Sequence, residues 1–142
     1  MDVAYPIVPF AAWVVAGSAK FAINSIKAGE PAFGQIGYGG LPSNHSAIVS
    51  SVAALIALRE GLDHPALGVA VALAFIVILD ASTLRRHVGR HAEAINRLAN
   101  WNAEADGRPL RERMGHTRIE IAAGIVVGIG VALIVDLLGD LL

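Results

Sequence analysis

The chain has 142 residues, of which 55% are hydrophobic and only 16% charged, with a formal net charge of −1 and a mean hydropathy of +0.60. This composition favours a membrane protein over a soluble one, and the length suits a single domain over residues 1–142. The absence of Cys excludes disulfides, thiol nucleophiles and thiolate metal sites.

Four apolar stretches follow one another along the chain, separated by polar segments. The first, at about residues 5–26, is long enough for the roughly 20 helical residues that cross a bilayer, whereas the second, from Pro42 to Leu58, is short for a full span. The third covers residues 66–79 and continues to 84, and the fourth covers about 119–138. The pattern predicts an all-α fold, a polytopic membrane bundle of about four transmembrane helices.

Two further patterns concern the last third of the chain. Between the third and fourth stretches, Val88, Ala92, Ile95 and Ala99 recur at helical spacing and Trp101 follows them, which predicts an interfacial amphipathic helix there. In the fourth stretch, Gly124 and Gly128 share one helix face, where they allow a neighbouring helix to approach closely. The same Gly-rich helix faces would also serve a homo-oligomer.

The distribution of positive charge predicts the orientation in the membrane. An even number of spans places both chain ends on one side, together with the turn at residues 61–65. Of the 11 Lys and Arg residues, all except Arg59 then fall at or near the other side. Because positively charged loops stay in the cytoplasm, we expect that side to be cytoplasmic. The expected location is the inner or plasma membrane of a bacterium.

The cytoplasmic side of the predicted bundle also collects the residues that can carry chemistry. They lie at helix ends far apart in the sequence, and they are Lys20, Lys27, His45, Asp80, Arg85, Arg86, His116 and Glu120. Two histidines, several fixed cations and the free N–H groups of a helix start suit a tetrahedral oxyanion, because they neutralise the charge that grows during phosphoryl transfer. The predicted site is therefore one for phosphate chemistry.

Three short motifs among these residues carry a family resemblance. Residues 39–47 read GGLPSNHSA, Asp80 is followed by Arg85-Arg86, and Gly115-His116-Thr117 is followed by Glu120. Together they resemble the divergent branch of the type 2 phosphatidic acid phosphatases, whose superfamily also contains the vanadium-dependent haloperoxidases. The resemblance covers nearly the whole chain and implies a membrane phosphatase.

The resemblance implies roles for both histidines. The family signature P-S-G-H is matched at residues 42–45 with Asn44 in place of Gly, which implies that His45 is the general acid that protonates the leaving oxygen. The end of the signature S-R-x5-H-x3-D is matched by His116 and Glu120, which implies that His116 attacks phosphorus. Glu120, in place of Asp, would orient the imidazole from the next helical turn.

The phosphate ligands match the family less closely. Lys20 is the first choice and Lys27 a weaker second, because the signature K-x6-R-P has Lys27-Ala28 at its second position. The position six residues before the nucleophile is Leu110, not Arg, so the missing phosphate clamp is assigned to Arg85 and Arg86, with Arg86 slightly favoured. Two further residues complete the predicted set: Ser43 as a phosphate ligand, and Asp80 either as an ion-pair anchor for Arg85 or Lys20 or as a direct participant.

The function implied is hydrolysis of a membrane lipid phosphate or diphosphate through a phosphohistidine intermediate. Phosphatidic acid, phosphatidylglycerol phosphate and isoprenyl diphosphates all present a suitable terminal phosphate. We expect no metal ion and no cofactor, because fixed cations take the place of Mg²⁺. The expected partners are the lipid phosphate substrate and membrane lipids, with no nucleic acid. Two alternatives stay open: a non-catalytic membrane protein that binds phosphate-bearing lipids, and a small anion transporter component.

Overall fold

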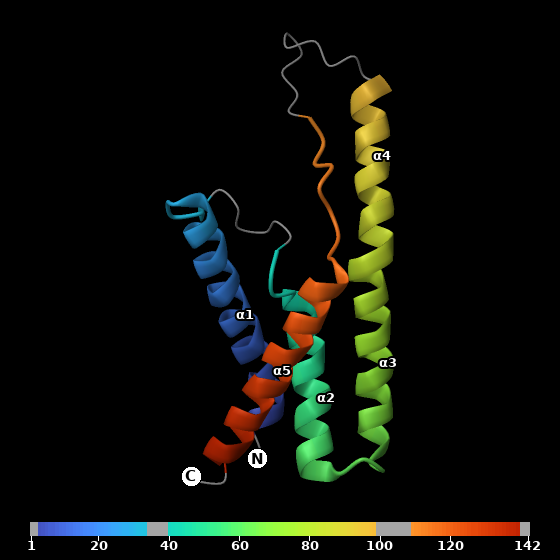
Figure 1. Cartoon of the computed structure of the whole chain (residues 1–142). Helices are drawn as coiled ribbons and strands as arrows, with labels where there is room; N and C mark the ends of the chain where they lie inside the picture. The colour runs from blue at the N-terminus through green and yellow to red at the C-terminus, as the bar shows by residue number, and fades with distance from the viewer. Residues whose placement is uncertain (1–2, 34–39, 99–108, 140–142) are drawn as a thin grey trace.

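The computed structural model describes residues 3–33, 40–98 and 109–139, in which the chain forms helices joined by short connections (Figure 1). The elements are α1 (Ala4–Ala28), α2 (Asn44–Glu60), α3 (Pro65–Leu79), a π-helical turn (Asp80–Leu84), α4 (Arg85–Leu98) and α5 (Arg118–Gly139). The predicted all-α class is confirmed, and the helices begin and end close to the predicted apolar stretches.

The helices alternate in direction, so that helix ends distant in sequence meet at one end of the bundle (Figure 1). This polar end comprises the end of α1, the start of α2, the π-helical turn and the start of α5. The start of α1 and the end of α5 lie at the opposite end. There Arg59 on α2 forms an ion pair with Asp136 on α5 at 2.7 Å.

Within the described residues, three helical segments are long and apolar enough to cross a membrane: Ala4–Ala28, Pro65–Leu98 and Arg118–Gly139. Helix α2 has 17 residues, fewer than the roughly 20 that a span requires, so the predicted count of four spans is not confirmed. The large apolar side chains of α3, among them Leu73 and Phe75, are exposed on the bundle surface. Such a surface is suited to contact with lipid.

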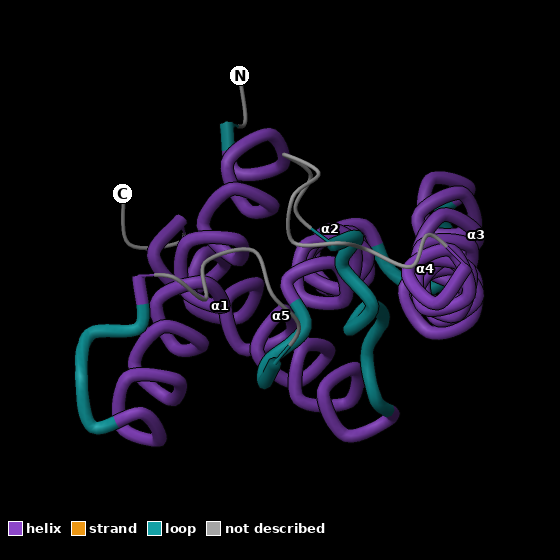
Figure 2. Tube along the Cα trace, turned by 90° about the horizontal axis from the view of Figure 1, so that it is seen from above, coloured by secondary structure: helices purple, strands orange, loops and turns teal. Residues whose placement is uncertain are grey.

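Helix α2 occupies the centre of the bundle, where it packs against α1, α3 and α5 (Figure 2). The buried core consists mainly of small and branched side chains from α1, α2 and α5: Val8, Ala12, Ala16, Ala47, Leu55, Val131 and Ala132. The predicted close approach at Gly124 and Gly128 occurs within the chain. A Cβ atom at Gly124 would lie 2.4 Å from the Ser43 carbonyl oxygen, and one at Gly128 would lie 2.4 Å from that of Ala47.

Gly128→Ala should therefore destabilise the bundle, because the added methyl group would force the backbones of α5 and α2 apart. We expect a loss of about 1–3 kcal/mol in the free energy of unfolding, measured by thermal unfolding in detergent. The matched control is Gly130→Ala on the same helix, where an added Cβ would meet nothing within 4 Å. The control should unfold with a free energy equal to that of the natural protein or higher by up to about 1 kcal/mol, because Ala favours a helix more than Gly does. Equal effects of both substitutions would contradict this packing.

Helix α4 forms where the sequence predicts an amphipathic helix. It covers residues 85–98, continues α3 along one line and projects beyond the polar end (Figure 1). The long helix continues without a break because no Gly or Pro occurs between Gly68 and Gly89. The end of the predicted amphipathic pattern, Ala99 and Trp101, lies outside the described residues.

Candidate functional site

The N-terminal cap of α2 contacts the start of α5 at the polar end, and this contact brings His45 and His116 together. Ser43 caps α2: its hydroxyl oxygen accepts hydrogen bonds from the backbone N–H of Ser46 at 3.3 Å and from the Ser46 hydroxyl at 3.1 Å. The Ser43 backbone N–H donates to the backbone carbonyl of Glu120 on α5 at 2.9 Å. The starts of α2 and α5 are thus joined directly, and the ring centroids of His45 and His116 lie 5.9 Å apart.

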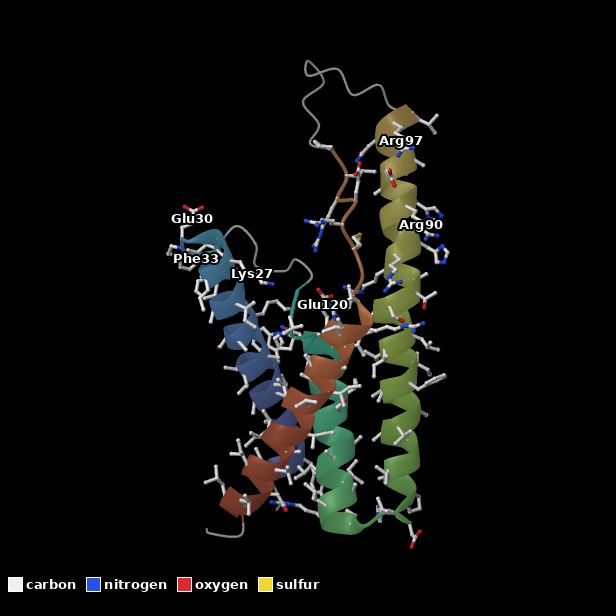
Figure 3. The ribbon with its side chains drawn as sticks, in the orientation of Figure 1. Lys27, Glu30, Phe33, Arg90, Arg97 and Glu120 are labelled. Atoms are coloured by element: carbon white, nitrogen blue, oxygen red, sulfur yellow. The ribbon has the colours of Figure 1, made fainter. Side chains whose placement is uncertain are left out.

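Both rings face a cavity of about 690 Å³ between α1, α2 and the segment that leads into α5. Its charged and polar lining includes Lys20, Asn24, Asn44, His45, Arg85, Arg111 and His116. Apolar side chains of α1 also line the cavity, among them Trp13, Val14 and Phe21. Trp13 and Val14 lie farther from the polar end than Lys20 does, and Phe33 lies near the end of α1 (Figure 3). The cavity therefore joins a cationic region to an apolar wall that runs along a membrane-spanning helix.

Three elements hold His116 in place, and only 7% of its surface is exposed. Its ring Nδ1 lies 3.1 Å from the Glu120 carboxylate, which also accepts the Thr117 backbone N–H at 2.9 Å. The Thr117 hydroxyl accepts the Glu120 backbone N–H at 3.3 Å, so Thr117 and Glu120 form a capping box at the start of α5. Glu120, labelled in Figure 3, thus caps the helix and orients the imidazole.

The main chain of His116 is fixed from the other side by the π-helical turn and α4. Its N–H donates to the Ala81 carbonyl at 2.9 Å, and its carbonyl accepts from the Arg86 guanidinium at 3.0 Å. Gly115 makes this approach possible: its φ is +90°, and a Cβ there would lie 2.9 Å from Arg86 Cγ. Gly at this position is therefore required by both backbone conformation and space.

The protonation state of His116 follows from this environment. Burial lowers the pKa of the imidazole below its ordinary value of 6.5, because a cation is disfavoured away from water. The hydrogen bond to Glu120 opposes this shift and raises the pKa, while the charge of Lys20 lowers it further. The ring is therefore mainly neutral at pH 7. Since a carboxylate only accepts, the proton stays on Nδ1 and the lone pair of Nε2 is available for attack.

Arg85 connects the π-helical turn to His45. Its Nε lies 3.4 Å from the Asp80 carboxylate, and its terminal nitrogen lies 3.2 Å from Nε2 of His45. Asp80 and Arg85 are five residues apart, a spacing that puts side chains on different faces of a regular α-helix. In the π-helical turn the Arg85 backbone N–H bonds to the Asp80 carbonyl, so residues five apart lie above one another. The ion pair depends on this local change of helix geometry.

Other predicted phosphate ligands lie in different environments. Lys20 lines the cavity, whereas Lys27 is exposed about two turns farther along α1 and is not among the lining residues (Figure 3). Ser43 is fully buried and acts as a helix cap. Arg86 donates to the main-chain carbonyl of His116 and does not line the cavity. The structure therefore brings Lys20, His45, Arg85 and His116 together around one space.

The sequence did not single out several residues that line this cavity. Trp13, Gly17, Lys20 and Asn24 repeat every three or four residues on α1, and this helical spacing from Lys20 could have identified them. Asn44 stands in the signature position of Gly, with its Oδ1 buried and unpaired among the described residues. Arg111 lines the cavity from a segment without regular structure, so no periodic signal could have found it.

Comparison with known proteins gives two matches. A family model described as the Divergent PAP2 family matches residues 3–131, a range that contains both histidines and the whole cavity lining. A relative from Bacillus subtilis (strain 168), the uncharacterized membrane protein YuiD, is 36% identical over 110 residues, which is 68% of this chain and 70% of the relative. No solved structure matches the chain significantly. By the extent of the family match and by this membrane relative, the chain belongs to the divergent PAP2 family.

Proposed function

We propose that this protein is a metal-independent phosphatase that hydrolyses a membrane lipid phosphate through a phosphohistidine formed on His116. The observation that carries the proposal is that four side chains line one cavity: His116, His45, Lys20 and Arg85. Glu120 orients the His116 ring, and the His45 ring lies next to it. A nucleophile oriented by a carboxylate, facing a second histidine, is the arrangement that two-step phosphoryl transfer requires.

The reaction proceeds in two displacements. Nε2 of His116 attacks phosphorus, the N–P bond forms, the bond from phosphorus to the lipid oxygen breaks, and His45 protonates the departing alkoxide. His45 then accepts a proton from water, whose oxygen attacks the phosphohistidine; the N–P bond breaks and inorganic phosphate leaves. Lys20 and Arg85 stabilise the charge on the phosphoryl oxygens in both steps, which is the work that Mg²⁺ performs in kinases.

His45 must carry a proton on Nε2 for the first step. A guanidinium only donates, so Nε2 of His45 accepts from Arg85 when the cavity holds no substrate. A phosphate dianion bound to Arg85 would release this hydrogen bond, and its negative charge would favour the protonated imidazole. Substrate binding thereby favours a proton on Nε2 of His45, which can then act as the general acid.

Arg85 is the better candidate for the phosphate clamp. It lines the cavity and is held by Asp80, whereas Arg86 is engaged by the His116 carbonyl on the other side of that loop. Asp80 then acts as an anchor for Arg85, one of the two roles that the sequence left open. A planar guanidinium fixed in this way can bind two phosphate oxygens at once.

The apolar wall of the cavity supports a lipid substrate. Trp13 lies seven residues before Lys20 on α1, which places it about 10 Å farther from the polar end along the helix axis. A substrate with its phosphate at Lys20 can therefore lay a hydrocarbon chain along Trp13 and Val14. A small soluble phosphate ester would leave this wall unfilled.

Glu120→Gln tests the orienting carboxylate without removing the helix cap, because Gln also serves in a capping box. We expect kcat to fall at least about tenfold, since the charge that stabilises the imidazolium is lost. Glu120 raises the pKa of His116, so its neutralisation lowers that pKa further. The reaction requires neutral His116, and the acidic limb of the pH–rate profile should therefore move to lower pH. An unchanged profile would show that Glu120 acts only as a cap.

The proposed activity is tested by phosphate release from purified protein with phosphatidic acid, phosphatidylglycerol phosphate and an isoprenyl diphosphate, each with EDTA and with added Mg²⁺. We expect turnover of at least one lipid in EDTA, and competitive inhibition by vanadate, which adopts the five-coordinate geometry of the transition state. Strict dependence on Mg²⁺ would contradict the proposal. Binding of the lipids without release would instead support the non-catalytic alternative.

We also propose that the cavity opens to the cytoplasmic side, because the polar end holds nearly all the positive charge of the chain. The chain lacks Cys, so Arg90→Cys on α4 and Asp63→Cys in the opposite turn give two single reporters. In intact cells, a membrane-impermeant thiol reagent should label position 63 and spare position 90 until the membrane is permeabilised. Rapid labelling at 90 with protection at 63 would reverse the orientation.

A further inference from the structure

A second hollow lies on the other side of the His116 loop, between the α3 end of the long helix and α5. It has a volume of about 370 Å³ and is lined by Ile78, Ser82, Thr83, Arg86, Arg118, Ile121, Ala122 and Ile125. Helices α3 and α5 both pack against α2 and not closely against each other (Figures 1 and 2). The hollow lies between these two helices. None of its lining residues belongs to the catalytic cavity.

The groove changes from polar to apolar along its length. On the long helix, Ile78, Ser82 and Arg86 are four residues apart and share one face. On α5, which runs in the opposite direction, Arg118, Ala122 and Ile125 share the facing side. Both arginines therefore lie at the polar end, with Ile78 and Ile125 about 10–12 Å deeper along the helix axes.

The charges at the polar end of the groove are all positive. Arg86 and Arg118 line it together with the hydroxyl-bearing Ser82 and Thr83, and no acidic side chain is among its described lining residues. Such a rim complements a phosphate group, while the deeper walls complement a hydrocarbon chain. A soluble anion would use the rim and leave the isoleucine walls exposed. A cationic rim joined to apolar walls therefore matches a membrane lipid with an anionic headgroup.

We propose that this groove binds an anionic glycerophospholipid, as a site separate from the substrate cavity. Its phosphate lies between Arg118 and Arg86, and one acyl chain lies along Ile78, Ala122 and Ile125. Arg86 connects the two sites, because the same guanidinium donates to the main-chain carbonyl of His116. The bound lipid therefore lies directly behind the segment that carries the nucleophile.

The proposal is tested by native mass spectrometry of the purified protein in detergent, with phosphatidylglycerol and phosphatidylcholine of identical chains. Phosphatidylglycerol carries a phosphodiester and no terminal phosphate, so its retention does not depend on phosphatase activity. We expect the natural protein to retain phosphatidylglycerol over phosphatidylcholine. Arg118→Gln should weaken that retention about tenfold, as the loss of one charge-assisted contact implies.

Three further variants decide where the lipid binds. Ala122 is exposed in the groove, so Ala122→Phe should block the acyl chain and reduce retention while both arginines remain. Arg90→Gln removes a charge from the exposed surface of α4 outside the groove, and Lys20→Gln removes one from the catalytic cavity. Both should retain the lipid as the natural protein does. A loss in Lys20→Gln but not in Arg118→Gln would place the lipid in the catalytic cavity and overturn the proposal.

Two other results would also overturn it. Equal losses in Arg118→Gln and Arg90→Gln would show that surface charge attracts the lipid without a defined site. Displacement of the lipid by glycerol phosphate at similar concentration would show that the rim binds a free anion and the apolar walls contribute nothing. Because turnover is not measured, an inactive protein that still retains the lipid through Arg118 and Ala122 would support this groove while contradicting the phosphatase.

Discussion

His116→Ala should reduce phosphate release from a lipid phosphate by at least about 10³-fold, because the substitution removes the proposed nucleophile. The fold should persist: the ring contact to Glu120 is lost, but the hydrogen bonds of the His116 backbone N–H and carbonyl, which hold this segment against Ala81 and Arg86, remain. The measurement is release of inorganic phosphate in detergent, with thermal unfolding as a check on the fold.

The matched control for the nucleophile is His87→Ala, which removes an exposed imidazole on α4 outside the cavity and should leave activity unchanged. Rapid quenching of the natural protein with labelled substrate should trap phosphate on His116 as an adduct that is labile in acid and stable in base, as expected of a phosphohistidine. Near-normal turnover in His116→Ala, or an adduct that survives acid, would contradict the mechanism.

His45→Ala should lower turnover of a lipid phosphate by about 10²–10⁴-fold, the usual contribution of a general acid. The effect should depend on the leaving group. A lipid alkoxide is a poor leaving group and needs the proton, whereas nitrophenolate departs without one. In a rapid-mixing experiment with nitrophenyl phosphate, His45→Ala should keep the first burst of nitrophenol and lose the later turnover, because water then lacks its base.

An equal loss of the burst with both substrates would show that His45 serves binding and not proton transfer. The matched variant is Arg85→Gln, which removes a charge that stabilises the phosphoryl group of either substrate. It should slow the burst with nitrophenyl phosphate as much as with the lipid. The two variants thus separate acid catalysis from phosphate binding at neighbouring positions, whose side chains lie 3.2 Å apart.

The sequence alone predicted that this is an all-α membrane protein and which helix ends carry its polar residues. Hydropathy and helical periodicity predicted the apolar helices, because burial in lipid imposes long uncharged stretches whatever the packing. Alternation of these stretches predicted that His45 and His116 meet at one end, and the structure places their rings 5.9 Å apart. The spacing of His116 and Glu120 also predicted their contact, although in the structure His116 precedes α5 and Glu120 reaches back to it from the first turn of that helix. These conclusions rest on local patterns.

Only the tertiary structure revealed the features that depend on a local departure from regular helix geometry or on contacts between residues far apart in the sequence. The five-residue spacing of Asp80 and Arg85 pairs their side chains only in a π-helical turn, which has no sequence signature. The same turn directs Arg85 to the cavity and Arg86 to the main chain of His116, although the two are adjacent and chemically alike. Ser43 became a buried cap because α5 packs against it at Gly124. A residue's partner across the bundle is set by packing between helices, which a single sequence does not record.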